Sequence, residues 1–188
     1  MEETVVTETQ QDSLITPKFL TVPMARSAIH GAFTLVFGPG GCLWSLPVKP
    51  IRTDCHVVIL VPGMTDHRAE DYPDWPAYPT KPVCLYEESR GDPSKFKHPF
   101  ANIARCKALQ LWTDRNDGRT GCIPHLLFPG DTPWWGGVKR HGLVAACSGL
   151  QPHLDQLIAG IVVDSLVALA HEAWLASPDQ EQRANFLT

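Results

Sequence analysis

A long apolar stretch from Leu154 to Leu175 dominates the C-terminal part of the sequence. Four ionisable residues interrupt it: Asp155, Asp164, His171 and Glu172. These interruptions favour a buried helix over about 152–176 rather than a membrane span. The segment just before it, Gly142–Gly149, is built from small and apolar residues, which predicts a buried strand that a helix can approach closely. The C-terminal part therefore requires a sheet with a long helix packed on it.

Length and charge limit the possible classes of protein. A chain of 188 residues is the size of one domain, and it carries 16 basic and 20 acidic residues. Because Glu2, Glu3, Glu8 and Asp12 precede the first Lys or Arg, the rest of the chain is close to neutral. This balance excludes a general nucleic-acid binder and a polybasic membrane anchor, both of which need clustered basic residues. We expect no nucleic-acid and no membrane partner.

The N-terminal segment and the cysteines indicate where the protein resides. Residues 1–16 are acidic and polar, the opposite of a signal peptide, and are predicted to form a disordered tail. The six cysteines contain no pair at zinc-finger or thioredoxin spacing, so they are interpreted as reduced thiols in a cytoplasmic protein. Residues 17–188 are expected to form a single domain.

The order of the remaining elements sets the fold class. Consecutive β-rich runs without helices between them favour an antiparallel sheet with helices packed on it, an α+β fold. The proline-rich segment 72–82 is expected to be an extended loop. The expected elements are a short helix over 21–30, a β-hairpin over 31–48 with its turn at 38–41, strands over 55–61, 83–88, 126–128 and 142–149, helices over 99–113 and 152–176, and a loop over 128–137.

Three short motifs carry a family resemblance. The sequence reads Arg-Cys-Lys-Ala at 105–108, Phe-Pro-Gly-Asp-Thr-Pro at 128–133, and Gly-Leu-Val-Ala-Ala-Cys-Ser-Gly at 142–149, followed by Asp155. Over about 102–170 the chain resembles the GlcG-like family, which includes the C-terminal domain of PduO-type proteins and HbpS-type haem-binding proteins. Asp131 stands where the family usually has a glycine, and the family's long N-terminal helix is poorly represented here.

The resemblance implies a profilin-like α+β sandwich that self-associates as a homo-oligomer and, in some members, binds haem. Haem iron can be held by one axial histidine in an apolar pocket. His30 is the candidate ligand, and so the candidate metal-binding residue, because it ends the N-terminal segment where related proteins place their haem contacts. The alternative is an ordinary, partly exposed histidine at a helix end.

An unusual pair of tryptophans adds a second candidate feature. Trp134 and Trp135 are followed by Gly136 and Gly137, and such aromatics can line a ligand pocket, anchor an interface or cover the end of a core. With His30, these four residues are the predicted cofactor site. The leading hypothesis is a small oligomeric binding protein for haem or another flat aromatic cofactor.

Two other classes of function stay open. The first is a small-molecule enzyme with its pocket near the Trp134 loop and Cys147, Ser148 or a histidine in the chemistry, although Cys147-Ser148 lacks the spacing of a nucleophile elbow. The second is a structural interaction module. A metal site formed by Asp54-Cys55-His56 and Asp66-His67 is disfavoured, because the adjacent strand residues Cys55 and His56 point to opposite faces.

Overall fold

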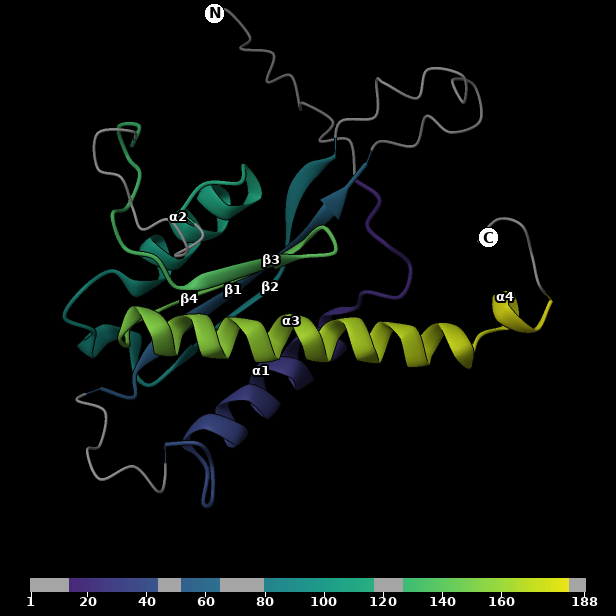
Figure 1. Ribbon diagram of the computed structural model, residues 1–188, viewed down its shortest axis with the longest axis horizontal. Coiled ribbons are helices and arrows are strands. Elements are labelled where there is room, and N and C mark those ends of the chain that lie inside the picture. The colour runs from purple at the N-terminus through teal and green to yellow at the C-terminus, as the bar shows by residue number, and fades with distance from the viewer. Residues whose placement is uncertain (1–13, 44–51, 65–79, 117–126, 183–188) are drawn as a thin grey trace, which may run out of the picture.

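The computed structural model describes residues 14–43, 52–64, 80–116 and 127–182. Its centre is a four-stranded sheet in the order β2-β1-β4-β3, in which every neighbouring pair is antiparallel (Figure 1). The strands are β1 (Cys55–Gly63), β2 (Lys81–Arg90), β3 (Gly137–Arg140) and β4 (Leu143–Ser148). The predicted α+β class and its antiparallel sheet are confirmed.

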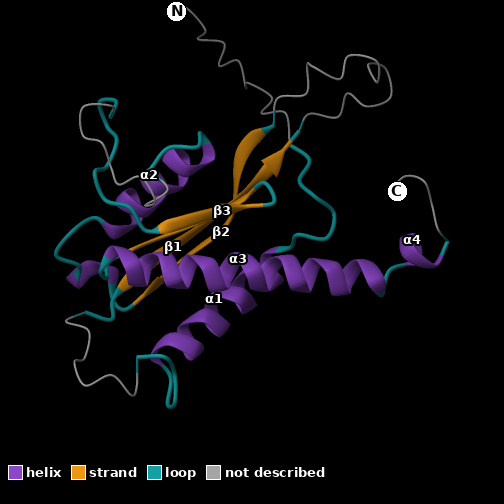
Figure 2. Cartoon of the chain, in the orientation of Figure 1, coloured by secondary structure: helices purple, strands orange, loops and turns teal. Residues whose placement is uncertain are grey.

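Helices cover both faces of this sheet (Figure 2). Helices α1 and α3 contact each other and pack on one face, whereas α2 packs on the other. Helix α3 runs on beyond the edge of the sheet toward the C-terminus, as Figure 1 shows. The helices are α1 (Val22–Phe37), α2 (Phe100–Trp112), α3 (Pro152–Leu175) and α4 (Pro178–Glu181), with a short 3₁₀ turn, η2, at Pro93–Lys95.

Strand β1 contributes to the apolar core on each side of the sheet. Since successive strand residues point to opposite faces, Val57 and Ile59 pack with α1 and α3, while Val58 and Leu60 pack with α2. Cys55 likewise belongs to the first core, and its neighbour His56 lies on the second face. The separation of Cys55 from His56 thus follows the strand period.

The predicted hairpin over 31–48 is wrong in its first strand. Residues 31–37 form the second half of α1, a 16-residue helix that buries Ala25, Ala28 and Ala32 completely or nearly so. The Thr21 hydroxyl accepts a hydrogen bond from the Met24 N–H (3.5 Å), and a proline in the first turn suits a helix start. The proposed second strand lies mainly at 44–48, outside the described residues.

Other predicted elements are confirmed with small shifts. Strands 55–61, 83–88 and 142–149 correspond to β1, β2 and β4, and helices 99–113 and 152–176 correspond to α2 and α3. Two details are wrong. Residues 127 and 128 form no strand. The expected loop over 128–137 ends in a strand, because β3 begins at Gly137.

The last residues of the predicted tail and of the predicted proline-rich loop belong to the folded part of the chain. Ile15, which belongs to the predicted tail, exchanges backbone hydrogen bonds with Met64 (2.7 and 2.9 Å). Lys81 and Pro82, at the end of the proline-rich segment, belong to β2. The rest of the predicted tail, 1–13, and residues 72–79 lie outside the described residues.

Helix α3 passes a simple test for a membrane span. Within the described part of the chain it is the one helix long and apolar enough to cross a bilayer, a property that core helices of soluble proteins share. Its inner face is buried against the sheet and α1 through residues that include Ile158, Val162 and Leu166. The predicted long C-terminal helix is confirmed.

Candidate functional site

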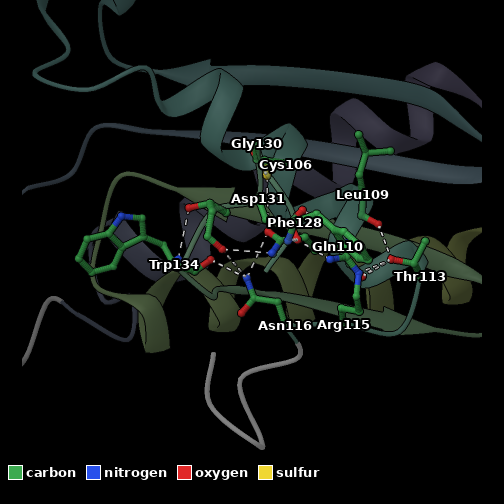
Figure 3. Close-up of polar contacts among 11 residues, drawn as sticks. Cys106, Leu109, Gln110, Thr113, Arg115, Asn116, Phe128, Gly130, Asp131 and Trp134 are labelled. Atoms are coloured by element: carbon green, nitrogen blue, oxygen red, sulfur yellow. Dashed lines mark hydrogen bonds and ion pairs between the residues drawn. The ribbon is translucent and has the colours of Figure 1, made fainter. Parts of the chain in front are cut away.

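The segment Phe128–Gly137, here called the aromatic loop, lies along the C-terminal half of α2. Gln110 Nε2 donates to the Thr132 carbonyl (3.1 Å), and the Cys106 thiol donates to the Gly130 carbonyl (3.2 Å). Asn116 Nδ2 donates to the Trp134 carbonyl (3.0 Å) (Figure 3). Backbone carbonyls that would face water in an ordinary loop are therefore hydrogen-bonded to α2 and the residues after it.

An ion pair fixes the start of the aromatic loop. Asp131 pairs with the Arg115 guanidinium and accepts a hydrogen bond from the Phe128 N–H (2.9 Å). The hydrogen bond from Arg115 lowers the pKa of Asp131 below its usual value, so the carboxylate is charged at neutral pH. Arg115 also lies over the Phe128 ring, 4.9 Å from its centroid. Asp131 thus closes this turn by an ion pair.

Two large aromatic side chains of this loop remain exposed. Phe128 is 65% and Trp134 is 59% accessible, whereas Trp135 is half-buried. Figure 3 shows the Trp134 indole pointing away from the hydrogen-bond network that holds its backbone. A fixed backbone with exposed aromatics loses little entropy when a partner binds, which is the usual property of a recognition surface.

The two glycines after the tryptophans contact the protein's own interior. Gly136 has φ +134°, and a Cβ at this position would lie 2.5 Å from the Asp155 Cβ and 3.1 Å from Lys107 Nζ. A Cβ on Gly137 would lie 2.7 Å from the Ala145 carbonyl oxygen. The absence of a side chain at Gly136 and Gly137 therefore allows the loop backbone to pack closely against α2, α3 and β4.

Beneath Gly136 lies a buried ion pair that joins α2, β4 and α3. Lys107 Nζ donates to Asp155 Oδ2 (2.9 Å) and to the Cys147 carbonyl (2.8 Å), and Asp155 Oδ1 accepts from the Leu150 N–H (3.2 Å). Both charged residues are about 2% accessible. Burial raises the pKa of Asp155, an effect that the Lys107 ammonium opposes.

The residues named for a possible nucleophile are also buried here. Cys147 is fully buried and Ser148 is 4% accessible. Burial raises the pKa of the Cys147 thiol, so it is protonated at neutral pH. Neither side chain is placed to meet a substrate at the surface.

His30 lies on the opposite face of the sheet from the aromatic loop. It projects from α1, and its Nε2 lies 2.9 Å from Glu88 Oε1 and 3.1 Å from Glu88 Oε2. The Tyr86 hydroxyl donates to the same carboxylate (3.0 Å), and Arg26 Nε donates to Tyr86 (3.2 Å). His30 is therefore an exposed member of a polar network.

The surroundings of His30 differ from those of a haem ligand. An axial histidine needs a free ring nitrogen facing an apolar pocket. Nε2 of His30 is engaged by Glu88, its surroundings are polar, and Trp134 and Trp135 lie across the sheet. Within one chain these residues do not fit a single haem pocket. Within the described ranges no group of three or more His, Cys, Asp or Glu side chains is placed to hold a metal ion.

The sequence does not reveal several residues that hold the aromatic loop. The local pattern places Gln110, Arg115 and Asn116 on a helix and the turn after it, yet their side chains bind the loop. The Asp-Arg-Asn-Asp-Gly run predicts a turn, and Asp114 and Asn116 do adopt positive φ values of 58° and 57°. Nothing in the local sequence indicates which distant backbone these side chains bind.

The fold and the site together define an α+β protein whose helices sandwich an antiparallel sheet and whose α2 carries a braced aromatic loop. Comparisons with protein-family models, curated proteins and solved structures find no match to this chain.

Proposed function

We propose that the protein is a small binding protein for a flat aromatic molecule, which stacks on the aromatic loop. One observation carries this proposal: Phe128 and Trp134 stay exposed on a loop whose backbone is fixed to α2. Offset stacking on an aromatic ring contributes about 0.5–1.5 kcal/mol beyond the burial of apolar area. Because the loop is already ordered, little of that gain is lost to ordering on binding.

The buried ion pair supports the proposed GlcG-like membership. Lys107, Cys147 and Asp155 come from three separate segments of the resemblance, and the Lys107 ammonium joins them through its hydrogen bonds to the Cys147 carbonyl and to Asp155. A lysine in α2, the end of β4 and an acidic residue opening the last helix are then parts of one packing arrangement. Haem stays in the proposal as one member of the class of flat aromatic molecules, and His30 as a candidate ligand would first have to leave Glu88.

Self-association is the second part of the proposal. Helix α3 extends beyond the sheet and exposes apolar side chains along its outer part, at Leu169 and Leu175. Exposed apolar side chains of this kind are suited to a contact with another copy of the chain. We propose a cytoplasmic homo-oligomer, and light scattering of the purified protein measures its mass directly.

A paired titration separates iron ligation from stacking. Haemin and iron-free protoporphyrin IX are titrated into the full chain, with binding followed by the porphyrin absorbance and by tryptophan fluorescence. The variants are Trp134→Ala, His30→Ala and, as a control, Leu35→Ala, which removes an exposed apolar side chain from α1 on the other face.

We expect both porphyrins to bind, with affinity reduced roughly tenfold in Trp134→Ala, as loss of about 1.4 kcal/mol implies. Leu35→Ala should bind as the unaltered protein does. Binding of haemin alone, lost in His30→Ala, would instead support ligation by that histidine. Absence of binding of either porphyrin to the folded protein would overturn the proposal for this ligand class.

If the protein is a structural interaction module, the same surface serves a protein partner. In that case replacing Trp134 and Trp135 lowers the mass measured by light scattering and neither porphyrin binds. Retention of the mass in Trp134→Ala together with loss of porphyrin binding favours the ligand-binding proposal.

A further inference from the structure

A second polar cluster lies on the sheet face that α2 covers, outside the aromatic loop. The register pairs His56 of β1 with Ser89 of β2, and Val58 with Glu87. Directly opposed residues of an antiparallel pair point to the same face. Ser89, His56 and Glu87 therefore project together toward α2.

The three side chains form a continuous chain of contacts. His56 Nδ1 lies 2.8 Å from Ser89 Oγ, and His56 Nε2 lies 3.5 Å from Glu87 Oε2. The first distance is a good hydrogen bond. The second is long, as catalytic contacts often are before a substrate binds. One ring nitrogen thus faces a hydroxyl and the other faces a carboxylate, which is the order of a serine–histidine–acid triad.

Arg105 of α2 holds the carboxylate in place. Its Nε donates to Glu87 Oε2 (2.8 Å), and its terminal nitrogen pairs with Glu87 Oε1. A bidentate arginine fixes the plane and the position of a carboxylate better than a single hydrogen bond does. Arg105 and Glu87 are then positioning residues, which orient the His56 ring toward Ser89.

The protonation states suit a general base. Burial lowers the pKa of His56 below its ordinary value of 6.5, and this effect outweighs the opposing attraction of Glu87. The hydrogen bond from Arg105 lowers the pKa of Glu87. At neutral pH the cluster therefore holds a neutral imidazole next to a charged carboxylate, and Nδ1 can accept the Ser89 proton when Nε2 carries the ring hydrogen.

The proposed nucleophile is more accessible than the proposed base. His56 is 6% accessible, whereas Ser89 is half-buried and lies on β2, an edge strand of the described sheet. The Glu87 side chain is 30% accessible. The partly accessible Ser89 on an edge strand is the group that a substrate would meet first, and the burial of the imidazole beside it favours a small acyl group.

We propose that Ser89, His56 and Glu87 form a catalytic triad that hydrolyses small carboxylic esters. Ser89 Oγ bonds to the ester carbonyl carbon while His56 Nδ1 takes the hydroxyl proton. The ester C–O bond then breaks, and the leaving alcohol takes that proton from His56. A water molecule, deprotonated by His56, attacks the acyl carbon, and Ser89 recovers its proton as the acid is released. The net reaction converts an ester and water into a carboxylic acid and an alcohol.

A covalent probe tests the proposal directly. An alkyl fluorophosphonate is incubated with the full chain, and the modified residue is located by peptide mass spectrometry. In this reaction the Ser89 oxygen bonds to phosphorus, fluoride leaves, and the proton passes to His56. Ser94 is the matched control, because it is a nearby serine whose hydroxyl donates to Asp92 (2.7 Å) rather than to a histidine.

We expect phosphonylation at Ser89 and none at Ser94. The rate should fall about 100-fold in His56→Gln, as loss of a general base implies, and less in Glu87→Gln. It should rise with pH to a plateau reached by about pH 7, since the pKa of His56 is below 6.5. Hydrolysis of 4-nitrophenyl acetate should be lost in Ser89→Ala and kept in Ser94→Ala, with circular dichroism confirming that both variants fold.

No modification of Ser89 in the folded protein would overturn the proposal. So would labelling whose rate is the same in His56→Gln, because the serine would then react without the imidazole. The readouts involve neither the aromatic loop nor porphyrin, so this result is independent of the proposed binding function.

Discussion

Lys107 and Asp155 form a fully buried ion pair at the junction of three elements. Burying two charges costs several kcal/mol per ion, and their attraction offsets this cost only with further hydrogen bonds. Here the Cys147 carbonyl and the Leu150 N–H supply these hydrogen bonds. The geometry indicates that the pair specifies how α2, β4 and α3 come together.

Removing one partner of this pair should destabilise the fold strongly. Lys107→Met leaves Asp155 buried without its cation, which is expected to lower the free energy of unfolding by about 3–5 kcal/mol. The double variant Lys107→Met with Asp155→Leu should recover most of this loss. Urea denaturation measures both, and a double variant no more stable than Lys107→Met would contradict a pairing role for these two residues at the junction.

The buried imidazole of His56 makes stability depend on pH. Its pKa is lowered in the folded protein, so the folded state binds a proton less readily than the unfolded chain does. Stability should therefore fall as the pH drops below about 6.5, toward the lowered pKa. The difference in free energy of unfolding between the wild type and His56→Gln should shrink over this range. A constant difference would mean that His56 has an ordinary pKa.

Helix α1 is the element in which local sequence misleads most. The run Gly-Ala-Phe-Thr-Leu-Val-Phe at 31–37 combines a glycine with β-branched and aromatic residues, and local propensity alone favours a strand. The longer pattern is helical, since Ala25, Ile29, Ala32 and Val36 are all buried in the core that α1 shares with α3. Tertiary packing thus decides between two structures that propensity leaves open.

Gly31 gives a direct test of this helix. It is exposed in the interior of α1, and a Cβ added at this position would have nothing within 4 Å. Gly31→Ala should raise the free energy of unfolding by about 0.5–1 kcal/mol, because alanine loses less backbone entropy in a helix. Thermal denaturation followed by circular dichroism measures the change. A destabilised variant would contradict a helix at this position.

The turn from the aromatic loop into β3 depends on Gly136. Its positive φ and the contact of a new Cβ with Asp155 leave no room for a side chain. Gly136→Ala should therefore lower stability by about 1–3 kcal/mol and displace Trp134. Urea denaturation and the tryptophan emission maximum report the two effects. Gly130→Ala is a control at another positive-φ glycine (φ +92°) where a Cβ meets nothing within 4 Å, and an equal loss in both variants would contradict a special role for the Asp155 contact.

At the scale of the whole molecule, the two cores share one sheet. Strand β1 sends alternate residues into both, so loss of packing in one core would disturb the strand that supports the other. We expect one cooperative unfolding transition, with coincident midpoints by tryptophan fluorescence and far-ultraviolet circular dichroism. Two separated midpoints would show that the α2 side unfolds on its own.

Much of the fold is predictable from periodicity and residue size, and the site is predictable only in part. The small residues of β4 and the apolar pattern of α3 identify both elements, and the paired tryptophans point to the loop that contains them. The Arg115–Asp131 pair and the meeting of Lys107 with Asp155 depend on tertiary contacts between segments 16 or more residues apart. His56 and Ser89 are 33 residues apart, and only the strand register brings them together.

The most direct test of the binding function is to locate the ligand on the chain. Backbone hydrogen exchange is measured by mass spectrometry for the full chain, with and without saturating protoporphyrin IX. Stacking on the aromatic loop predicts slower exchange confined mainly to residues 127–137 and to the end of α2, and loss of this protection in Trp134→Ala. Protection centred instead on α1 around His30, or no change at the aromatic loop despite binding, would contradict it.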